Sequence, residues 1–137
     1  HVRRDAADTC LSMFKLRFYS GYAFTNELES LAHYYAAYEA IMAHWRGLFG
    51  DRIFELRYET LTGEFEETVR SLLDHCGLPW DASCLVFHKG QRRVLTHSAA
   101  QIREPINSRA VGAAKKFEAE MRPFQEALET CRAEFKR

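Results

Sequence analysis

The sequence predicts an α/β domain in which helices dominate. Two long segments, residues 26–50 and 117–135, repeat apolar side chains every three or four positions, as amphipathic helices do. A shorter segment, "RIFELRYE" at residues 52–59, alternates in the manner of a buried strand. One strand and a fragment cannot form a sheet that buries its own faces, so either the fold is mainly helical or partner strands lie outside this sequence.

The first half of the chain contains a strand end and two helices. His1 and Val2 are expected to end a strand, and Asp8 is expected to N-cap a helix through "TCLSMFKLRF". A longer helix follows, with a capping arrangement at Asn26 and Glu29 and a stop at Gly50. Its predicted apolar face consists of Leu28, Leu31, Tyr35, Tyr38, Met42, Trp45 and Phe49.

The second half contains two further helices and a long loop. The apolar spacing from Phe65 to Cys76 predicts a helix that ends at Gly77, and Asp81 can cap a short helix through "ASCLVFH". Residues 89–107 have no periodicity and are expected to form a loop, with a turn of helix near "SAAQ". The final helix is expected to bend or break at Pro123.

Composition and charge exclude several functional classes. Of the 137 residues, 47% are hydrophobic and 28% are charged, which suits a globular domain with one core. The net charge is zero, so no overall field attracts nucleic acid or an anionic membrane. Seven Lys and Arg residues nevertheless lie between positions 89 and 116 against a single acid, Glu104. Such a local basic segment suits a small, multiply charged anion.

The cysteines and the hydropathy pattern indicate a cytoplasmic protein. The four cysteines are scattered without a C-x-x-C pair, which favours free thiols over a metal site or a disulfide framework. No apolar run approaches the roughly 20 residues of a membrane span. The opening residues are not expected to be a signal peptide, and a chain that starts so abruptly is expected to continue upstream of His1.

The opening stretch "RRDAADTCLS" is the first candidate anion site. Arg4 is expected to project from a strand-to-helix turn, with Ser12 one helical turn beyond Asp8. A guanidinium, a hydroxyl and a helix N-terminus together can bind phosphate. The alternative is a solvated, capped helix start in which Asp5 pairs with an arginine.

The basic loop is the second candidate. Arg103 and Arg109 flank a proline, and Gly112 would allow close approach of the backbone to a ligand. The alternative is a solvated charged loop. No Ser-His-Asp set and no Gly-rich phosphate loop can be assembled from this sequence.

Four segments, taken in order, resemble sulfotransferases that use 3′-phosphoadenosine 5′-phosphosulfate (PAPS). "RRDAADTCLS" is similar to their R-x-P-x-D-x-x-x-S signature, and "LRYETL" is similar to their RYEDL strand end. "LLDHCGLPWDASCLVFH" and "THSAAQIREPI" resemble the following helices and the nucleotide-covering loop of the bacterial branch, which includes members fused to tetratricopeptide repeats. Ala6 replaces the proline of the signature, and "GAAKKF" lacks the aromatic that usually follows the covering-loop glycine.

This resemblance implies a fold, a donor and a set of ligands. Residues 1–137 are expected to form the C-terminal, helix-dominated part of the sulfotransferase fold, a relative of P-loop nucleotide-binding proteins. The phosphosulfate loop and the usual catalytic base are expected upstream of His1. The donor would be PAPS, without a metal. The residues that match its 3′-phosphate and adenine contacts are Arg4, Ser12, Tyr58, Arg103, Arg109 and Gly112.

The resemblance leaves the partners and two other functions open. The acceptor would be a hydroxyl or amine of a small molecule, glycan or peptide, and the chain is expected to join the rest of its own polypeptide or a homo-oligomer. A non-catalytic nucleotide-binding module would bind adenosine 3′,5′-bisphosphate without turnover. A helical protein-interaction module would bind no nucleotide.

Overall fold

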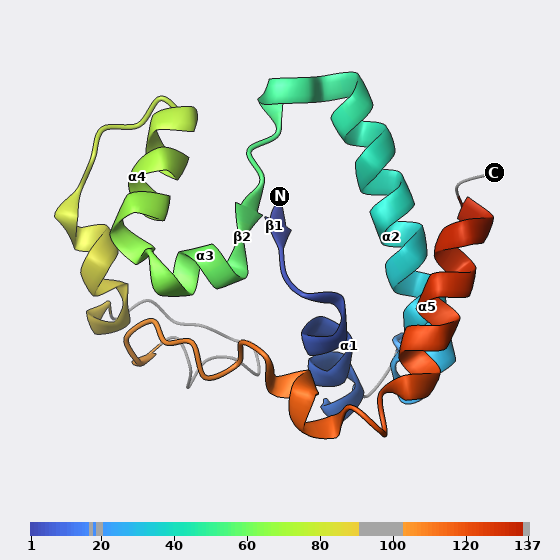
Figure 1. Cartoon of the computed structure of the whole chain (residues 1–137). Coiled ribbons are helices and arrows are strands. Elements are labelled where there is room, and N and C mark those ends of the chain that lie inside the picture. Colours follow the sequence, from blue (N-terminus) through green and yellow to red (C-terminus); the bar gives the residue numbers. More distant parts are fainter. Residues whose placement is uncertain (17, 19–20, 91–102, 136–137) are drawn as a thin grey trace. The chain divides into compact units, whose positions relative to one another are not determined.

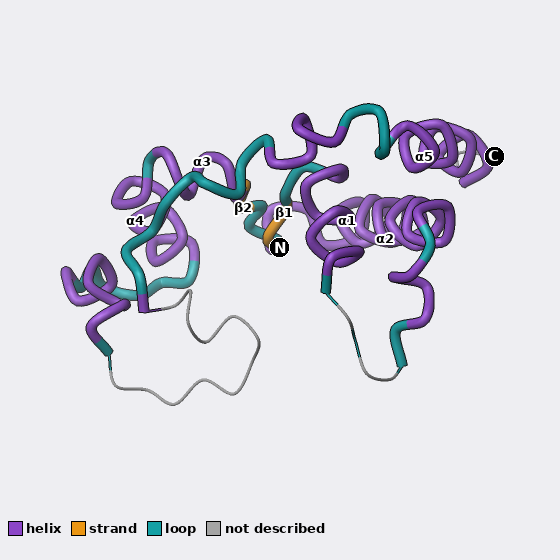
Figure 2. The backbone as a smooth tube through the Cα atoms, turned by 90° about the horizontal axis from the view of Figure 1, so that it is seen from below, coloured by secondary structure: helices purple, strands orange, loops and turns teal. Residues whose placement is uncertain are grey.

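The chain forms two compact units, each built from two separate stretches of sequence. The computed structural model describes residues 1–16, 18, 21–90 and 103–135 (Figure 1). The strand unit comprises residues 1–3 and 54–109, and the helical unit comprises residues 4–53 and 110–137. Most of the described backbone in both units is helical (Figure 2).

A two-stranded parallel sheet begins the strand unit. Strand β1 (Val2–Arg3) pairs with β2 (Leu56–Arg57), with Val2 opposite Leu56 and Arg3 opposite Arg57. The predicted strand at residues 52–59 is therefore confirmed for its central residues Leu56 and Arg57 alone, because β1 has just two residues with which they can pair. Helix α3 (Tyr58–Gly63) starts immediately after β2.

Two helical segments complete the described part of the strand unit. Helix α4 (Phe65–His75) ends before Gly77, whose φ of 66° allows the reversal that was predicted there. The Asp81 side chain accepts a hydrogen bond from the Ser83 N–H and caps the 3-10 segment η3 (Ala82–Lys89), which confirms the predicted cap. The loop residues 91–102, including the turn predicted at "SAAQ", lie outside the described residues.

The described residues of the helical unit form three α-helices. They are α1 (Ala6–Lys15), α2 (Leu28–Phe49) and α5 (Arg122–Phe135). Short 3-10 turns lie at η1 (Ala23–Asn26), η2 (Gly50–Arg52) and η6 (Ala113–Phe117). Helices α2 and α5 lie side by side in both ribbon views, and Arg132 of α5 donates two hydrogen bonds, of 2.7 and 2.8 Å, to the Glu39 carboxylate of α2 (Figures 1 and 2).

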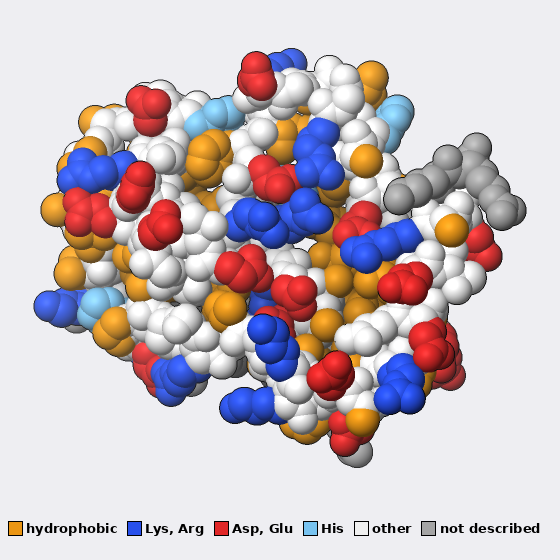
Figure 3. All heavy atoms as spheres, viewed as in Figure 1, with side chains coloured by type: hydrophobic (Ala, Val, Ile, Leu, Met, Phe, Trp, Pro, Cys, Tyr) orange, Lys and Arg blue, Asp and Glu red, His pale blue; other side chains and the backbone are white. Residues whose placement is uncertain are grey.

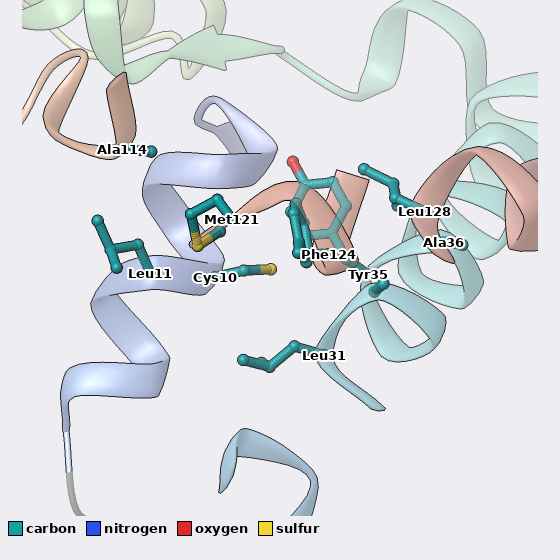
Figure 4. Close-up of a cluster of buried hydrophobic side chains, with 10 residues drawn as sticks. Cys10, Leu11, Leu31, Tyr35, Ala36, Ala114, Met121, Phe124 and Leu128 are labelled. Atoms are coloured by element: carbon teal, nitrogen blue, oxygen red, sulfur yellow. The ribbon is translucent and has the colours of Figure 1, made fainter. Parts of the chain in front are cut away.

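The core of the helical unit joins α1, α2 and the C-terminal segment. Its side chains point toward one another between these elements (Figure 4). Phe124 of α5, 1% exposed, and Leu31 of α2 are its largest fully buried side chains. The remaining members are Cys10, Leu11, Ala32, Tyr35, Ala36, Ala114, Met121 and Leu128.

The predicted cap of α2 is wrong, whereas the predicted break in the final helix is present. Asn26 belongs to η1 and does not cap α2, which starts after Glu27 without a side-chain cap. The predicted break at Pro123 is confirmed, because α5 begins at Arg122 after η6 and a turn, and Pro123 lies in its first turn, where a missing N–H has no cost.

The apolar face predicted for α2 is buried over its first half alone. Leu31 and Tyr35 belong to the core, whereas Trp45 is 41% exposed and Phe49 42% exposed. Gly50, with a φ of 50°, ends the helix as predicted.

Phe124→Ala should lower the free energy of unfolding by about 3–5 kcal/mol, because it leaves a cavity at a fully packed position. Phe135→Ala is the matched control on the same helix, since Phe135 is 44% exposed. The control should change the free energy of unfolding by less than about 1 kcal/mol. Denaturant titration measures both values, and equal losses would contradict this assignment of the core.

Candidate functional site

The N-terminus of α1 is capped by Asp5. Its carboxylate accepts a hydrogen bond of 2.9 Å from the Asp8 N–H, and its carbonyl accepts one of 3.0 Å from the Thr9 N–H. The prediction that Asp8 is the N-cap is therefore wrong. An aspartate immediately before the first helical residue caps the helix equally well, and this leaves Asp8 inside the first turn.

Asp8 instead joins α1 to the C-terminal segment. Its side chain is 2% exposed, and its two carboxylate oxygens accept hydrogen bonds of 2.6 Å from the Gly112 N–H and 2.8 Å from the Ala114 N–H. We call this pair of hydrogen bonds the Asp8 bridge. Gly112 has a φ of 72°, a left-handed conformation that favours glycine, at the point where the bridge begins.

Arg4 is held at both its side chain and its backbone. Its guanidinium donates a hydrogen bond of 2.6 Å to the Ala110 carbonyl, two residues before Gly112. Its own carbonyl accepts a hydrogen bond of 2.9 Å from the hydroxyl of Tyr35, whose ring belongs to the core. Arg4, the Asp8 bridge and the turn at residues 110–114 thus form one connected group within the helical unit.

Ser12 lies one turn beyond Asp8 on α1, and its side chain is exposed. The Cα–Cβ bonds of a helix tilt toward its N-terminus, so the hydroxyl of Ser12 leans toward the end of α1 that Arg4 precedes. The hydroxyl is therefore accessible to a ligand that also reaches the start of α1.

The other three predicted site residues belong to the strand unit. Tyr58 is half-buried and is the first residue of α3. The guanidinium of Arg103, an exposed residue, donates to the carbonyl of Gly90. Arg109 is 73% exposed and donates to the carboxylate of Glu104 and to the side-chain oxygen of Asn107.

The electrostatics of the helical unit are compatible with a bound anion. The charge of Asp8 is already stabilised by two backbone N–H groups, and Asp5 is engaged as the cap. Arg4 and the exposed lysines of η6, Lys115 and Lys116, supply positive charge on the segments that the Asp8 bridge joins. A guanidinium with a nearby hydroxyl can hold a phosphate in place and orient it.

Cys10 is the one thiol of the opening stretch, and it is 1% exposed. Burial, with smaller contributions from the negative charges of Asp5 and Glu39, raises the pKa of this thiol to about 12. A thiol with such a pKa remains protonated near neutral pH, so Cys10 is a core residue and does not act as a nucleophile.

The described residues contain neither a membrane-spanning helix nor a cluster of metal ligands. Basic and acidic side chains are interspersed over the face drawn in Figure 3. No helix in the described ranges is both long and apolar enough to span a bilayer. Within the same ranges, His, Cys, Asp and Glu side chains do not gather in threes that could hold a metal ion.

Two residues of this group have roles that the sequence did not predict. Asp8 was assigned to the helix cap, and Tyr35 was assigned to the apolar face of α2. The aspartate position in the signature was the available signal for Asp8. No local pattern indicated that the Tyr35 hydroxyl would bind the backbone of Arg4.

Comparison with known proteins gives two matches. A family model described as "Sulfotransferase family" matches residues 1–82, which include α1, α2, β2, α3 and α4. A protein of Aquifex aeolicus (strain VF5), described as uncharacterized, is 35% identical over 134 residues. This alignment covers 94% of the present chain and 17% of the Aquifex protein, so the chain spans about a sixth of that relative's length.

Cys10 should react with iodoacetamide at pH 8 far more slowly than Cys76, because its buried thiol has a pKa of about 12 and Cys76 is exposed. Peptide mass spectrometry over a time course measures both rates, and addition of denaturant should bring them together. Equal rates in the folded protein would contradict the burial of Cys10.

Proposed function

The chain belongs to the sulfotransferase family, and from this premise we propose that it binds the 3′-phosphate and adenine side of PAPS. The complete enzyme would transfer the sulfuryl group of PAPS to a hydroxyl or amine acceptor. Because the chain spans 17% of the length of its Aquifex relative, the activity of the whole protein is part of this proposal.

The position of Arg4 is the observation that supports the proposal most. Arg4 precedes the capped start of α1, and its guanidinium reaches the carbonyl of Ala110. A guanidinium has five N–H donors in a planar fork, so it can contact a carbonyl and a phosphate together. Ser12, exposed on the same helix, would donate its hydroxyl to the same phosphate.

The departure from the family signature at Ala6 does not prevent this arrangement. Ala6 is the first residue of α1, a position where proline is favoured because its N–H is not needed within the helix. Alanine is also a good helix former, and the Asp5 cap defines the helix start in its place.

Arg4 and Ser12 would position the donor and would not take part in the chemical step. Their contribution to the rate would come from orientation, whereas a base would deprotonate the acceptor. By resemblance, Tyr58 would lie near the adenine, and Arg103 and Arg109 would contact the 3′-phosphate. Gly112 would act through its backbone conformation, because its N–H already donates to Asp8.

Arg4→Ala should weaken the binding of adenosine 3′,5′-bisphosphate about ten- to a hundredfold, because a charge-assisted hydrogen bond contributes about 1.5–3 kcal/mol. Isothermal titration calorimetry of the wild type and the variant measures this difference.

Arg3→Ala is the matched control, since it removes the same charge from the adjacent residue, whose guanidinium contacts Glu55 at 3.5 Å. The control should bind within about threefold of the wild type, because long-range charge effects at a screened surface are small. Equal losses in both variants would contradict the role of Arg4. Failure of the wild type to bind would favour a helical interaction module.

A further inference from the structure

Asp8 lies where it can influence ligand binding without contacting the ligand itself. We propose that Asp8 is a positioning residue of the anion site, which fixes the turn at residues 110–114 and thereby sets the position of the Arg4 guanidinium. This inference rests on the proposed function, because it concerns the affinity for the same 3′-phosphate.

The Asp8 bridge uses both oxygens of one buried carboxylate. Oδ2 lies 2.6 Å from the Gly112 nitrogen, and Oδ1 lies 2.8 Å from the Ala114 nitrogen. Two hydrogen bonds to a rigid carboxylate determine both the distance and the orientation of the turn relative to α1. The carboxylate is 2% exposed and both of its oxygens are occupied, so Asp8 is not placed to act as a base.

The same turn provides the carbonyl that binds Arg4. Ala110 lies two residues before Gly112, and its carbonyl accepts the 2.6 Å hydrogen bond from the Arg4 guanidinium. The other end of Arg4 is fixed by the Tyr35 hydroxyl, 2.9 Å from the Arg4 carbonyl. If the turn moved away from α1, the Arg4 backbone would stay in place while its guanidinium would lose the hydrogen bond to the Ala110 carbonyl.

A purely electrostatic view makes the opposite prediction. The carboxylates of Asp5 and Asp8 repel a phosphate, so removal of either charge would strengthen its binding. If Asp8 positions the turn, its removal weakens binding although a repulsive charge is lost. Whether removal of the Asp8 charge weakens or strengthens phosphate binding therefore distinguishes the two views.

Asp8→Asn is the decisive variant, because it preserves the side-chain shape but provides one acceptor in place of two. The amide nitrogen would face a backbone N–H, and two donors cannot bond. We expect the affinity for adenosine 3′,5′-bisphosphate, measured by calorimetry and corrected for the folded fraction, to fall at least tenfold. Backbone amide exchange at Gly112 and Ala114 should accelerate in the same variant.

Asp5→Asn is the matched control. It makes the same chemical change on the same helix, and asparagine caps helices as well as aspartate does. This control should bind the bisphosphate with an affinity within about threefold of the wild type or tighter.

Gly112→Ala tests the proposal without a change of charge, and it applies even if Asp8→Asn does not fold. A Cβ at Gly112 would meet nothing closer than the Lys115 side chain at 3.7 Å, so the strain arises from the φ of 72° alone. We expect this variant to remain folded and to bind the bisphosphate at least fivefold more weakly.

The outcomes distinguish this inference from the proposed function. If the wild type binds and both Asp8→Asn and Gly112→Ala bind equally well, Asp8 has no positioning role and the proposed function stands. If Asp8→Asn loses affinity only in proportion to its unfolded fraction, Asp8 is merely structural and the inference is overturned. If the wild type itself does not bind, the proposed function fails and this inference fails with it.

Discussion

A carboxylate buried at the start of α1 requires hydrogen-bond donors, because an uncompensated charge in a protein interior is strongly destabilising. Asp8 receives these donors from Gly112 and Ala114, so the C-terminal segment has to pass close to α1. This path brings Ala114 and Met121 into the core with α1 and α2, and it presents the Ala110 carbonyl to Arg4. The core and the candidate phosphate site of the helical unit therefore depend on the same interaction.

The sequence predicts those elements whose causes are local. The three-four spacing of α2 and α4 and the glycines after them are visible in single stretches, and these helices end near the predicted residues. The start of α1 is different, since Asp5 and Asp8 are both good caps and the choice depends on the distant partners of Asp8. The periodicity does not predict the exposure of Trp45 either, because a repeat identifies an apolar helix face but not the element that covers it.

The candidate site likewise contains some features that the sequence predicts and others that it does not. The spacing of Arg4 and Ser12 could be matched to a known signature, and the family match over residues 1–82 agrees with that resemblance. Sequence reasoning could not find that the Tyr35 hydroxyl holds the Arg4 carbonyl, since the hydroxyl of a tyrosine on an apolar helix face has no local signal for its partner. The roles of Arg103, Arg109 and Tyr58 in ligand binding stay predictions from the resemblance.

The sequence separation of the Asp8 bridge has a consequence for the order in which the protein assembles. Its two hydrogen bonds join residues 104 and 106 positions apart, so a ribosome has to synthesise the intervening strand unit before Asp8 can meet its donors. Contacts of such long range form late, after the entropy of closing the intervening chain has been lost. Burial of α1 before that point would leave the Asp8 carboxylate without these two donors, so the packing of α1 against α2 is complete only when the C-terminal turn is in place.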